Sequence, residues 1–200
     1  MLPTRLMILA AVAVTAALTL AACGGDDDDG GSDDEADITE AIEVSATSDD
    51  PANCTELQTQ AFTEQTEFAT GDEAIASCEE VEEDDTAESV EVSNIEVDGD
   101  TATAEVAVTG GGLDGQTLGL SLVKEGDQWK LDSFDEFVSF DKAAFTSALV
   151  EEASADPETP PEVATCVEEA IIAAPEEQIQ SAFLSGDEQQ LVGLFGTCFQ

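Results

Sequence analysis

The chain has 200 residues, of which 47 are Asp or Glu and 4 are Lys or Arg, and its formal net charge is −43. So acidic a chain repels phosphate, which excludes nucleic-acid binding through a basic patch. It contains no His, which excludes His-dependent triads and imidazole-ligated metals. Hydrophobic residues still make up 42% of the chain, enough for one folded domain with an appendage.

Residues 1–22 have the pattern of an export signal. Arg5 precedes an apolar run over residues 6–20 that only Thr15 and Thr19 interrupt. The run is shorter than the roughly 20 apolar residues that a membrane-spanning helix needs. We therefore predict a signal peptide over residues 1–22. An ordinary secretory signal that leaves Cys23 free is the alternative to lipid attachment.

The junction Leu20-Ala21-Ala22-Cys23 resembles the lipobox of bacterial lipoproteins. In that family the cysteine receives a diacylglyceryl group and becomes the first residue after cleavage. The resemblance implies lipidation at Cys23 and export to the extracytoplasmic face of the cell membrane. Two or more acyl chains are sufficient for stable anchoring.

Residues 23–50 are strongly acidic, since they are rich in Asp and Glu and contain neither Lys nor Arg. Such a segment buries little apolar surface, and like charges extend it. We predict a disordered acidic tether over 23–50. A Ca²⁺-binding tract is the alternative, although the segment lacks the mixed ligand spacing of an organised Ca²⁺ loop.

The pattern of residues 51–140 predicts an α+β domain. One helix begins at Asp50-Pro51 and stops before Gly71, and Asp72 caps a second helix that ends in the acidic stretch 79–85. Four alternating segments follow over 90–97, 102–108, 118–122 and a short last strand around 129–131, with a β-bulge at Ser93-Asn94. Tight turns between them predict a curved antiparallel sheet, covered by the two preceding helices.

The segments 89–102 and 122–131, preceded by two helices, resemble the nuclear transport factor 2-like fold, especially the small cone-shaped domains of bacterial lipoproteins. The likeness extends over residues 52–140 and implies a conical pocket between sheet and helices. Enzymes of that superfamily place acid–base groups, often His or Asp, inside the cone. This chain has no His and no acidic residue on the apolar strand phase, so the resemblance implies binding.

Residues 141–200 are predicted to form a helical C-terminal unit. Asp141 caps a first helix, Thr159-Pro160 begins a second, and Pro175 breaks the second. Gly186 stops the next segment and Asp187 caps the last helix. The Phe and Leu residues of this unit are expected in its core.

Four cysteines remain besides Cys23, which in an exported chain implies disulfides with three possible connectivities. An internal similarity favours local pairing. Phe-Ala-Thr-Gly-Asp-Glu at 68–73 lies between Cys54 and Cys78, and Phe-Leu-Ser-Gly-Asp-Glu at 183–188 lies between Cys166 and Cys198. Each unit is a helix hairpin whose arms bring its own cysteines together, which favours Cys54–Cys78 and Cys166–Cys198. A redox-active or metal-binding thiol set is the alternative.

Two weaker acidic patterns are interpreted as parts of the fold and not as binding sites. The spacing from Asn94 to Glu105 superficially resembles a Ca²⁺ loop, but strand alternation on both sides favours a hairpin. The carboxylates of 79–85 are expected on a solvated helix end. We therefore assign no catalytic, cofactor-binding or metal residue, and expect no cofactor.

The sequence favours a membrane-anchored, non-enzymatic binding or interaction module of the cell envelope. The expected partners are the membrane, through lipid on Cys23, and a small apolar ligand or an envelope protein, with the chain as a monomer. A carboxylate-dependent hydrolase or isomerase that uses the cone pocket, and a structural surface component without a ligand, are the alternatives.

Overall fold

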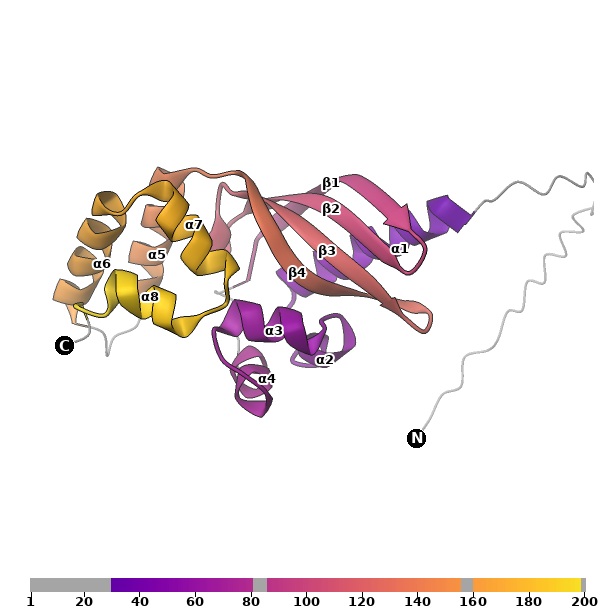
Figure 1. Ribbon diagram of the computed structural model, residues 1–200, viewed down its shortest axis with the longest axis horizontal. Helices are drawn as coiled ribbons and strands as arrows, with labels where there is room; N and C mark the ends of the chain where they lie inside the picture. The colour runs from indigo at the N-terminus through magenta and orange to yellow at the C-terminus, as the bar shows by residue number, and fades with distance from the viewer. Residues whose placement is uncertain (1–29, 81–85, 156–159, 199–200) are drawn as a thin grey trace, which may run out of the picture.

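The computed structural model describes residues 30–80, 86–155 and 160–198 (Figure 1). These residues form eight α-helices and a four-stranded antiparallel sheet, which confirms the predicted α+β class. The elements in chain order are α1 (Gly30–Thr47), α2 (Asn53–Glu56), α3 (Gln60–Glu67), α4 (Asp72–Cys78), β1 (Ser89–Asp98), β2 (Thr101–Thr109), the 3₁₀ turn η2 (Gly111–Leu113), β3 (Thr117–Glu125), β4 (Gln128–Ser139), α5 (Lys142–Ala155), α6 (Pro161–Ala173), α7 (Glu176–Leu184) and α8 (Glu188–Phe195).

The sheet is a meander in the order β1-β2-β3-β4, as the alternation of apolar residues predicts. The bulge expected at Ser93-Asn94 is confirmed. The β1–β2 register shifts between Ser93 and Glu96, and Asn94 has a φ of 52°. The tight turn at Asp98-Gly99 is also confirmed, since β1 ends at Asp98 and β2 begins at Thr101.

The last strand is longer than the sequence predicts. β4 continues to Ser139, with Phe134 and Phe137 paired with residues of β3. Three register shifts between β3 and β4 interrupt the alternation of inward and outward side chains. A period-two pattern cannot be followed through such shifts in the sequence alone, so the predicted strand ended too early.

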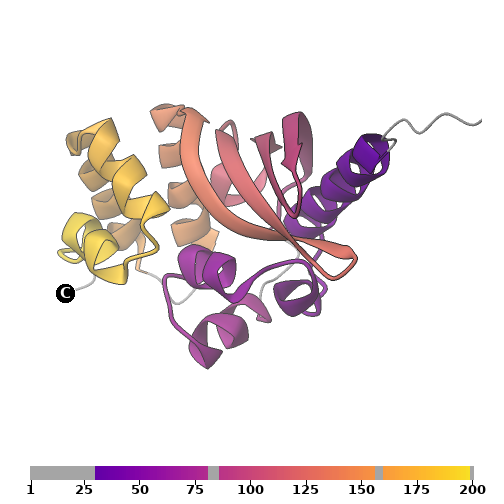
Figure 2. The ribbon, with the colours of Figure 1, turned by 45° about the vertical axis from the view of Figure 1, so that its right-hand side comes forward.

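The larger hydrophobic core lies between one face of the sheet and helices α1 and α3. Figure 2 shows the curvature of the strands and α1 lying along the sheet. The strands contribute alternate residues to this core: Ala102, Ala104, Val106, Leu120, Leu122, Trp129 and Leu131. Ile38, Ala41 and Ile42 of α1 and Phe62 of α3 pack against them.

Helix α1 corrects the predicted tether. Residues 30–47 were expected to be disordered, but they form an 18-residue helix. Ile38 and Ile42 are four positions apart and therefore lie on one helix face, which is buried against the sheet. Most acidic residues described on this helix are exposed, whereas Asp34 is half-buried and accepts hydrogen bonds from Lys124 and Trp129. Averaging composition over the whole of 23–50 conceals this separation of apolar and acidic faces.

The predicted helix over 51–70 is divided in the structure into α2 and α3. Thr59 N donates to Leu131 O, and Leu131 N donates to Leu57 O, both at 2.9 Å. Residues 57–59 thus continue the hydrogen bonding of β4 at the sheet edge and cannot remain helical. The cover of the sheet also differs from the prediction, because α1 and α3 pack on the strands while α4 packs against α2 and α3.

Helices α5, α7 and α8 follow the predicted starts and breaks, whereas α6 begins at Pro161 with Pro160 as its N-cap, and the predicted Thr159 lies outside the described residues. Asp141 Oδ1 accepts hydrogen bonds from the backbone N–H groups of Ala143 and Ala144 at the start of α5. Asp187 Oδ1 accepts from Gln189 N at the start of α8. A second core lies among these helices and contains Phe145, Val163, Val167, Ile171, Ile179 and Cys198. Within the described residues, no helix has the length and apolar content needed to cross a membrane.

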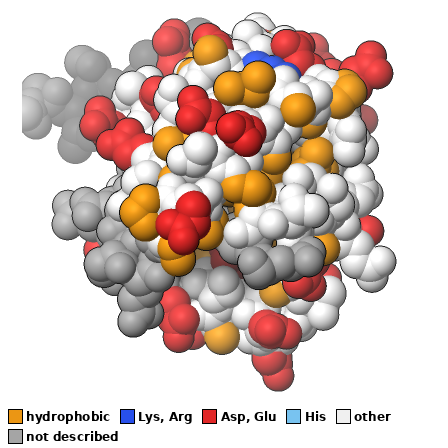
Figure 3. All heavy atoms as spheres, turned by 90° about the vertical axis from the view of Figure 1, so that its left-hand side faces the viewer, with side chains coloured by type: hydrophobic (Ala, Val, Ile, Leu, Met, Phe, Trp, Pro, Cys, Tyr) orange, Lys and Arg blue, Asp and Glu red, His pale blue; other side chains and the backbone are white. Residues whose placement is uncertain are grey.

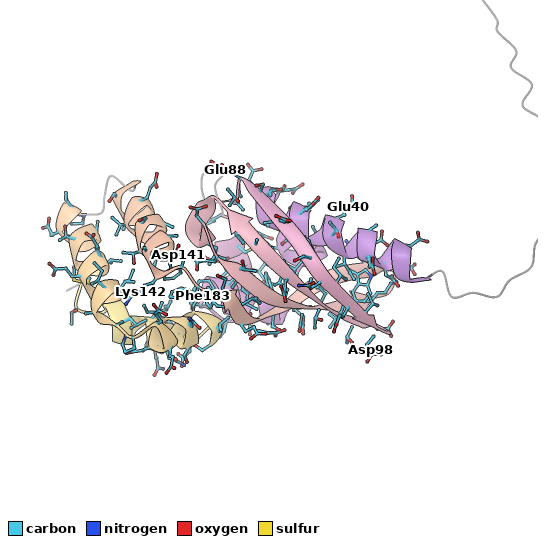
Figure 4. The ribbon with its side chains drawn as sticks, turned by 90° about the horizontal axis from the view of Figure 1, so that it is seen from above. Glu40, Glu88, Asp98, Asp141, Lys142 and Phe183 are labelled. Carbon is cyan, nitrogen blue, oxygen red and sulfur yellow. A yellow bond between two sulfur atoms is a disulfide. The ribbon has the colours of Figure 1, made fainter. Side chains whose placement is uncertain are left out.

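Phe183 of α7 joins the helical unit to the sheet. Its ring lies 5.6 Å from that of Phe137, 6.3 Å from that of Phe134 and 5.8 Å from that of Phe68, measured between centroids. Gln65 Nε2 donates to Phe134 O and Leu184 O and thereby links the same elements. In Figure 4, the labelled Phe183 lies beside Asp141 and Lys142 where the strands meet the C-terminal helices.

Candidate ligand groove

The main candidate site is a groove of about 400 Å³ between α1, α2 and the turn that joins β3 to β4. These three elements lie side by side at the end of the molecule opposite the C-terminal helices (Figure 1). Its apolar lining comes from Ala41, Val44, Leu57 and Trp129. Its acidic lining comes from Asp37, Glu40, Glu56 and Asp127.

The α1 wall is positioned by Asp34, one turn before the groove residues of that helix. Asp34 Oδ1 accepts a hydrogen bond from Lys124 Nζ at 2.5 Å and another from Trp129 Nε1 at 3.0 Å. The hydrogen bond from Lys124 is the main cause of the lowered pKa of Asp34, and the same bond raises the pKa of Lys124. Because Trp129 is only 1% exposed, its bond to Asp34 also satisfies the buried indole N–H.

The α2 wall is a four-residue helix that depends on its neighbours for support. The Cys54–Cys78 disulfide ties it to α4. Lys130 Nζ donates to Thr55 O at 2.9 Å, which connects α2 to β4. Thr63 Oγ1 donates to Cys54 O at 3.4 Å, which connects it to α3.

Asn53, in the same wall, has an unusual hydrogen-bonding state. Its Nδ2 is buried and donates no hydrogen bond, and within the described ranges it is the single buried side-chain N or O atom in this state. Such a donor is costly unless an acceptor reaches it. Asn53 also lines the groove, but its Nδ2 is buried and is not exposed to a molecule in the groove.

The electrostatics of the groove are one-sided. Among the described residues, its lining holds four carboxylates and neither Lys nor Arg. Lys124 of β3 pairs with Asp34, and its Nζ lies 5.4 Å from the centroid of the Trp129 ring. Lys124 also interacts electrostatically with Asp37 and Asp127 of the lining, whereas Lys130 pairs with Glu125 at 3.2 Å. The lining is therefore predominantly negative, with part of its charge compensated by Lys124 on the adjoining strand.

Both predicted disulfides are confirmed. Cys54 and Cys78 are bonded, with their Cα atoms 6.0 Å apart. Cys166 and Cys198 are bonded, with their Cα atoms 5.5 Å apart. Of these four cysteines, Cys54 and Cys78 lie near the groove, whereas the other pair closes the C-terminal unit.

The remaining predicted positions divide into two groups. Cys23, the predicted lipidation site, lies outside the described residues, as do positions 81–85 of the acidic stretch. The Asn94–Glu105 segment forms the predicted hairpin, in which Asn94 Nδ2 donates to Glu105 Oε2 across the strands at 2.8 Å. Among the described residues, no cluster of three or more Cys, Asp or Glu side chains is arranged to hold a metal ion.

The α1 side of the groove was not predicted, because Asp37 and Glu40 fall in the segment expected to be a disordered tether. A signal was present: Ile38, Ala41 and Ile42 have the i, i+3, i+4 spacing of an apolar helix face. Three apolar positions within an acidic segment were too few to outweigh its composition.

Comparison of the chain with protein-family models, with curated proteins and with solved structures returned no match. The geometry and charge of the groove are therefore the basis for the functional interpretation.

Proposed function

We propose that this protein is an exported, lipid-anchored binding module of the cell envelope, without enzymatic activity, whose ligand lies in the groove between α1, α2 and the β3–β4 turn. The predicted signal over residues 1–22 and the lipobox-like junction at Cys23 support export and anchoring. The two disulfides indicate an oxidising compartment outside the cytoplasm.

The groove is the observation that carries the binding proposal. Its volume of about 400 Å³ lies in the range of ligand sites, and its lining combines apolar and polar side chains, as such sites do. Glu40, labelled in Figure 4, projects from α1 at the end of the molecule away from Phe183. The chain contains no His to act as an acid–base partner for the rim carboxylates, which favours binding over catalysis.

We also propose that the sheet and its covering helices have the nuclear transport factor 2-like architecture. The curved four-stranded meander (Figure 2) and the helix α1 along its face support this assignment. The space under the sheet is filled by α1 and α3 side chains, including Ile38, Ile42 and Phe62. On this assignment the ligand site lies at the margin of the cone, between the helices and the β3–β4 turn.

The proposed anchor has a geometric consequence. Cys23 and the start of α1 at Gly30 are close in the chain, so these two positions are at most about 25 Å apart. The first residue of α1 would therefore lie close to the bilayer, and the C-terminal helices would extend away from it. The body is thus tethered more closely than a disordered linker over the whole of 23–50 would allow.

Anchoring is tested with Cys23→Ala. The wild-type chain should fractionate with membranes, and intact-mass analysis should show acyl groups on its mature N-terminus. The variant should lose both properties and keep the far-ultraviolet circular dichroism of the folded body. An unmodified wild-type N-terminus would refute the lipid anchor.

Binding is tested by placing a photo-crosslinking residue at Val44, which is 37% exposed and lines the groove. The matched control carries the same residue at Glu96, an exposed position on β1. Irradiation of the chain in its native envelope should give an adduct at Val44 and none at Glu96. No adduct at Val44, or equal adducts at both positions, would refute the groove as the ligand site.

A further inference from the structure

We infer that the Cys166–Cys198 disulfide is a thiol-sensitive latch that holds helix α8 on the C-terminal unit, and that an exported dithiol protein opens it. The Cys54–Cys78 disulfide, in contrast, is a permanent part of the fold. This inference concerns the end of the molecule away from the groove, so it does not depend on the ligand proposed there. Three features carry it: the unequal burial of the two disulfides, the sparse packing of α8 and the firm attachment of α7.

The two disulfides differ in how far solvent reaches them. Cys54 of α2 and Cys78 of α4 are only 4% and 7% exposed. Cys198 is 9% exposed, but its partner Cys166 on α6 is half-buried. Thiol–disulfide exchange begins when a thiolate reaches one sulfur atom of the bond, so its rate depends on access. A dithiol should therefore attack the C-terminal disulfide first, at Cys166.

Helix α8 has little packing of its own. It has eight residues, fewer than an isolated helix needs to be stable in water. The structure describes all eight, and none of them is buried. Phe195 packs, half-buried, on the second core, and Cys198 lies in that core three positions later. The attachment of α8 therefore depends largely on the bond from Cys198 to Cys166.

Helix α7, by contrast, is held independently of this bond. Its residues Ile179 and Ala182 are buried, and Leu184 O accepts a hydrogen bond from Gln65 Nε2 of α3. Gly186 follows with a φ of +60°, a conformation that favours glycine. Figure 1 shows α7 leading towards α3 and α8 turning back towards the C-terminus. The chain is thus fixed up to the end of α7 and turns at Gly186, which makes 187–198 the segment that the latch releases.

The proposed step is a reversible two-electron exchange. A thiolate of the dithiol attacks Cys166 Sγ, the bond to Cys198 breaks, and Cys198 leaves as a thiolate that takes up a proton. The second thiol then attacks the mixed disulfide and releases Cys166, so the dithiol gives up two electrons and two protons and becomes a disulfide. Release of α8 uncovers the second core, to which α6 contributes Val163, Val167 and Ile171. The reduced protein thus presents an apolar surface that the oxidised protein covers.

The first experiment uses dithiothreitol as the dithiol. The full chain, purified with its disulfides formed, is incubated over a range of dithiothreitol concentrations and alkylated with iodoacetamide. Cleavage after Glu places Cys54, Cys78, Cys166 and Cys198 on four different peptides for mass spectrometry. Cys166 and Cys198 should be alkylated at a dithiothreitol concentration at least about tenfold lower than the other pair requires.

Hydrogen–deuterium exchange then shows which segment moves. When only the C-terminal disulfide is reduced, the amides of α8 should exchange at least about tenfold faster, and those of α7 and β4 should change less than about twofold. Oxidised glutathione should restore the protection of α8. The variant Cys166→Ser/Cys198→Ser should show the fast exchange without reductant. The matched control Cys54→Ser/Cys78→Ser also removes one disulfide and should keep α8 protected.

Several results would overturn the inference. Equal sensitivity of both disulfides to dithiothreitol would exclude a selective latch. Unchanged exchange of α8 after reduction would show that packing, and not the bond, holds this helix. Fast exchange of α7 together with α8, or protection that reoxidation does not restore, would mean that reduction unfolds the whole C-terminal unit. The wild-type titration gives each of these results, so the decision does not require either serine variant to fold.

Discussion

Replacing Ile38 with Ala tests whether α1 belongs to the folded body. Its side chain is 0% exposed in the core against the sheet. The substitution removes three carbons, worth about 2.4 kcal/mol at about 0.8 kcal/mol each, and the remaining cavity raises the loss to about 3–4 kcal/mol. This is a large part of the roughly 5–15 kcal/mol by which a typical domain is stable.

The loss is measured by urea unfolding, followed through the fluorescence of Trp129, which lies in the same core as Ile38. With a urea dependence of about 2 kcal/mol per M, the midpoint of Ile38→Ala should fall by about 1.5–2 M. Glu43→Ala, at an exposed position of α1, should change stability by less than about 0.5 kcal/mol. Equal midpoints for both variants and the wild type would refute the packing of α1 on the sheet.

Three further predictions concern charge and backbone conformation. The hydrogen bond from Lys124 lowers the pKa of Asp34 in the folded protein. The ionised Asp34 carboxylate therefore stabilises the fold at pH values above the ordinary pKa of 3.8, and this stabilisation is lost as the pH falls through the lowered pKa. The difference in Tm between wild type and Asp34→Asn should therefore stay constant from pH 7 to the ordinary value of 3.8 and shrink at lower pH. A difference that stays constant below this pH as well would contradict the prediction. Gly186 has a φ of +60°, and an added Cβ would lie 2.7 Å from Gln65 Cα. Gly186→Ala should thus destabilise the fold by about 1–3 kcal/mol in urea, whereas Gly193→Ala, a helical position with open space, should stabilise it. Figure 3 shows acidic side chains spread over the C-terminal end of the molecule. Because salt screens the repulsion between them, Tm should rise between about 0.1 M and 1 M NaCl. A Tm that does not change over this range would show that charge repulsion does not limit the stability of the fold.

Much of the fold was predictable because it depends on interactions between residues close in the sequence. Asp141 and Asp187 cap the helices that follow them, and a cap needs only a side chain and the next turn of backbone. The two hairpin disulfides join cysteines of one local unit each. The lipid anchor and the likeness to the nuclear transport factor 2-like fold stay predictions, since Cys23 lies outside the described residues and no family model or solved structure matched.

The sequence by itself determined the fold class, the strand order of the meander, the helix caps at Asp141 and Asp187 and the local disulfide partners, whereas Asp72, predicted as a cap, is the first residue of α4 and makes no side-chain cap. Only the tertiary structure decided that residues 30–47 fold, because Ile38 and Ile42 gain stability only when the sheet buries them. It also decided the break at Leu57–Thr59, which follows from hydrogen bonds to Leu131 in the last strand, far away in the sequence. The groove depends on both events, since one wall is α1 and the other is α2. Contacts between distant segments create it, and no local pattern encodes them.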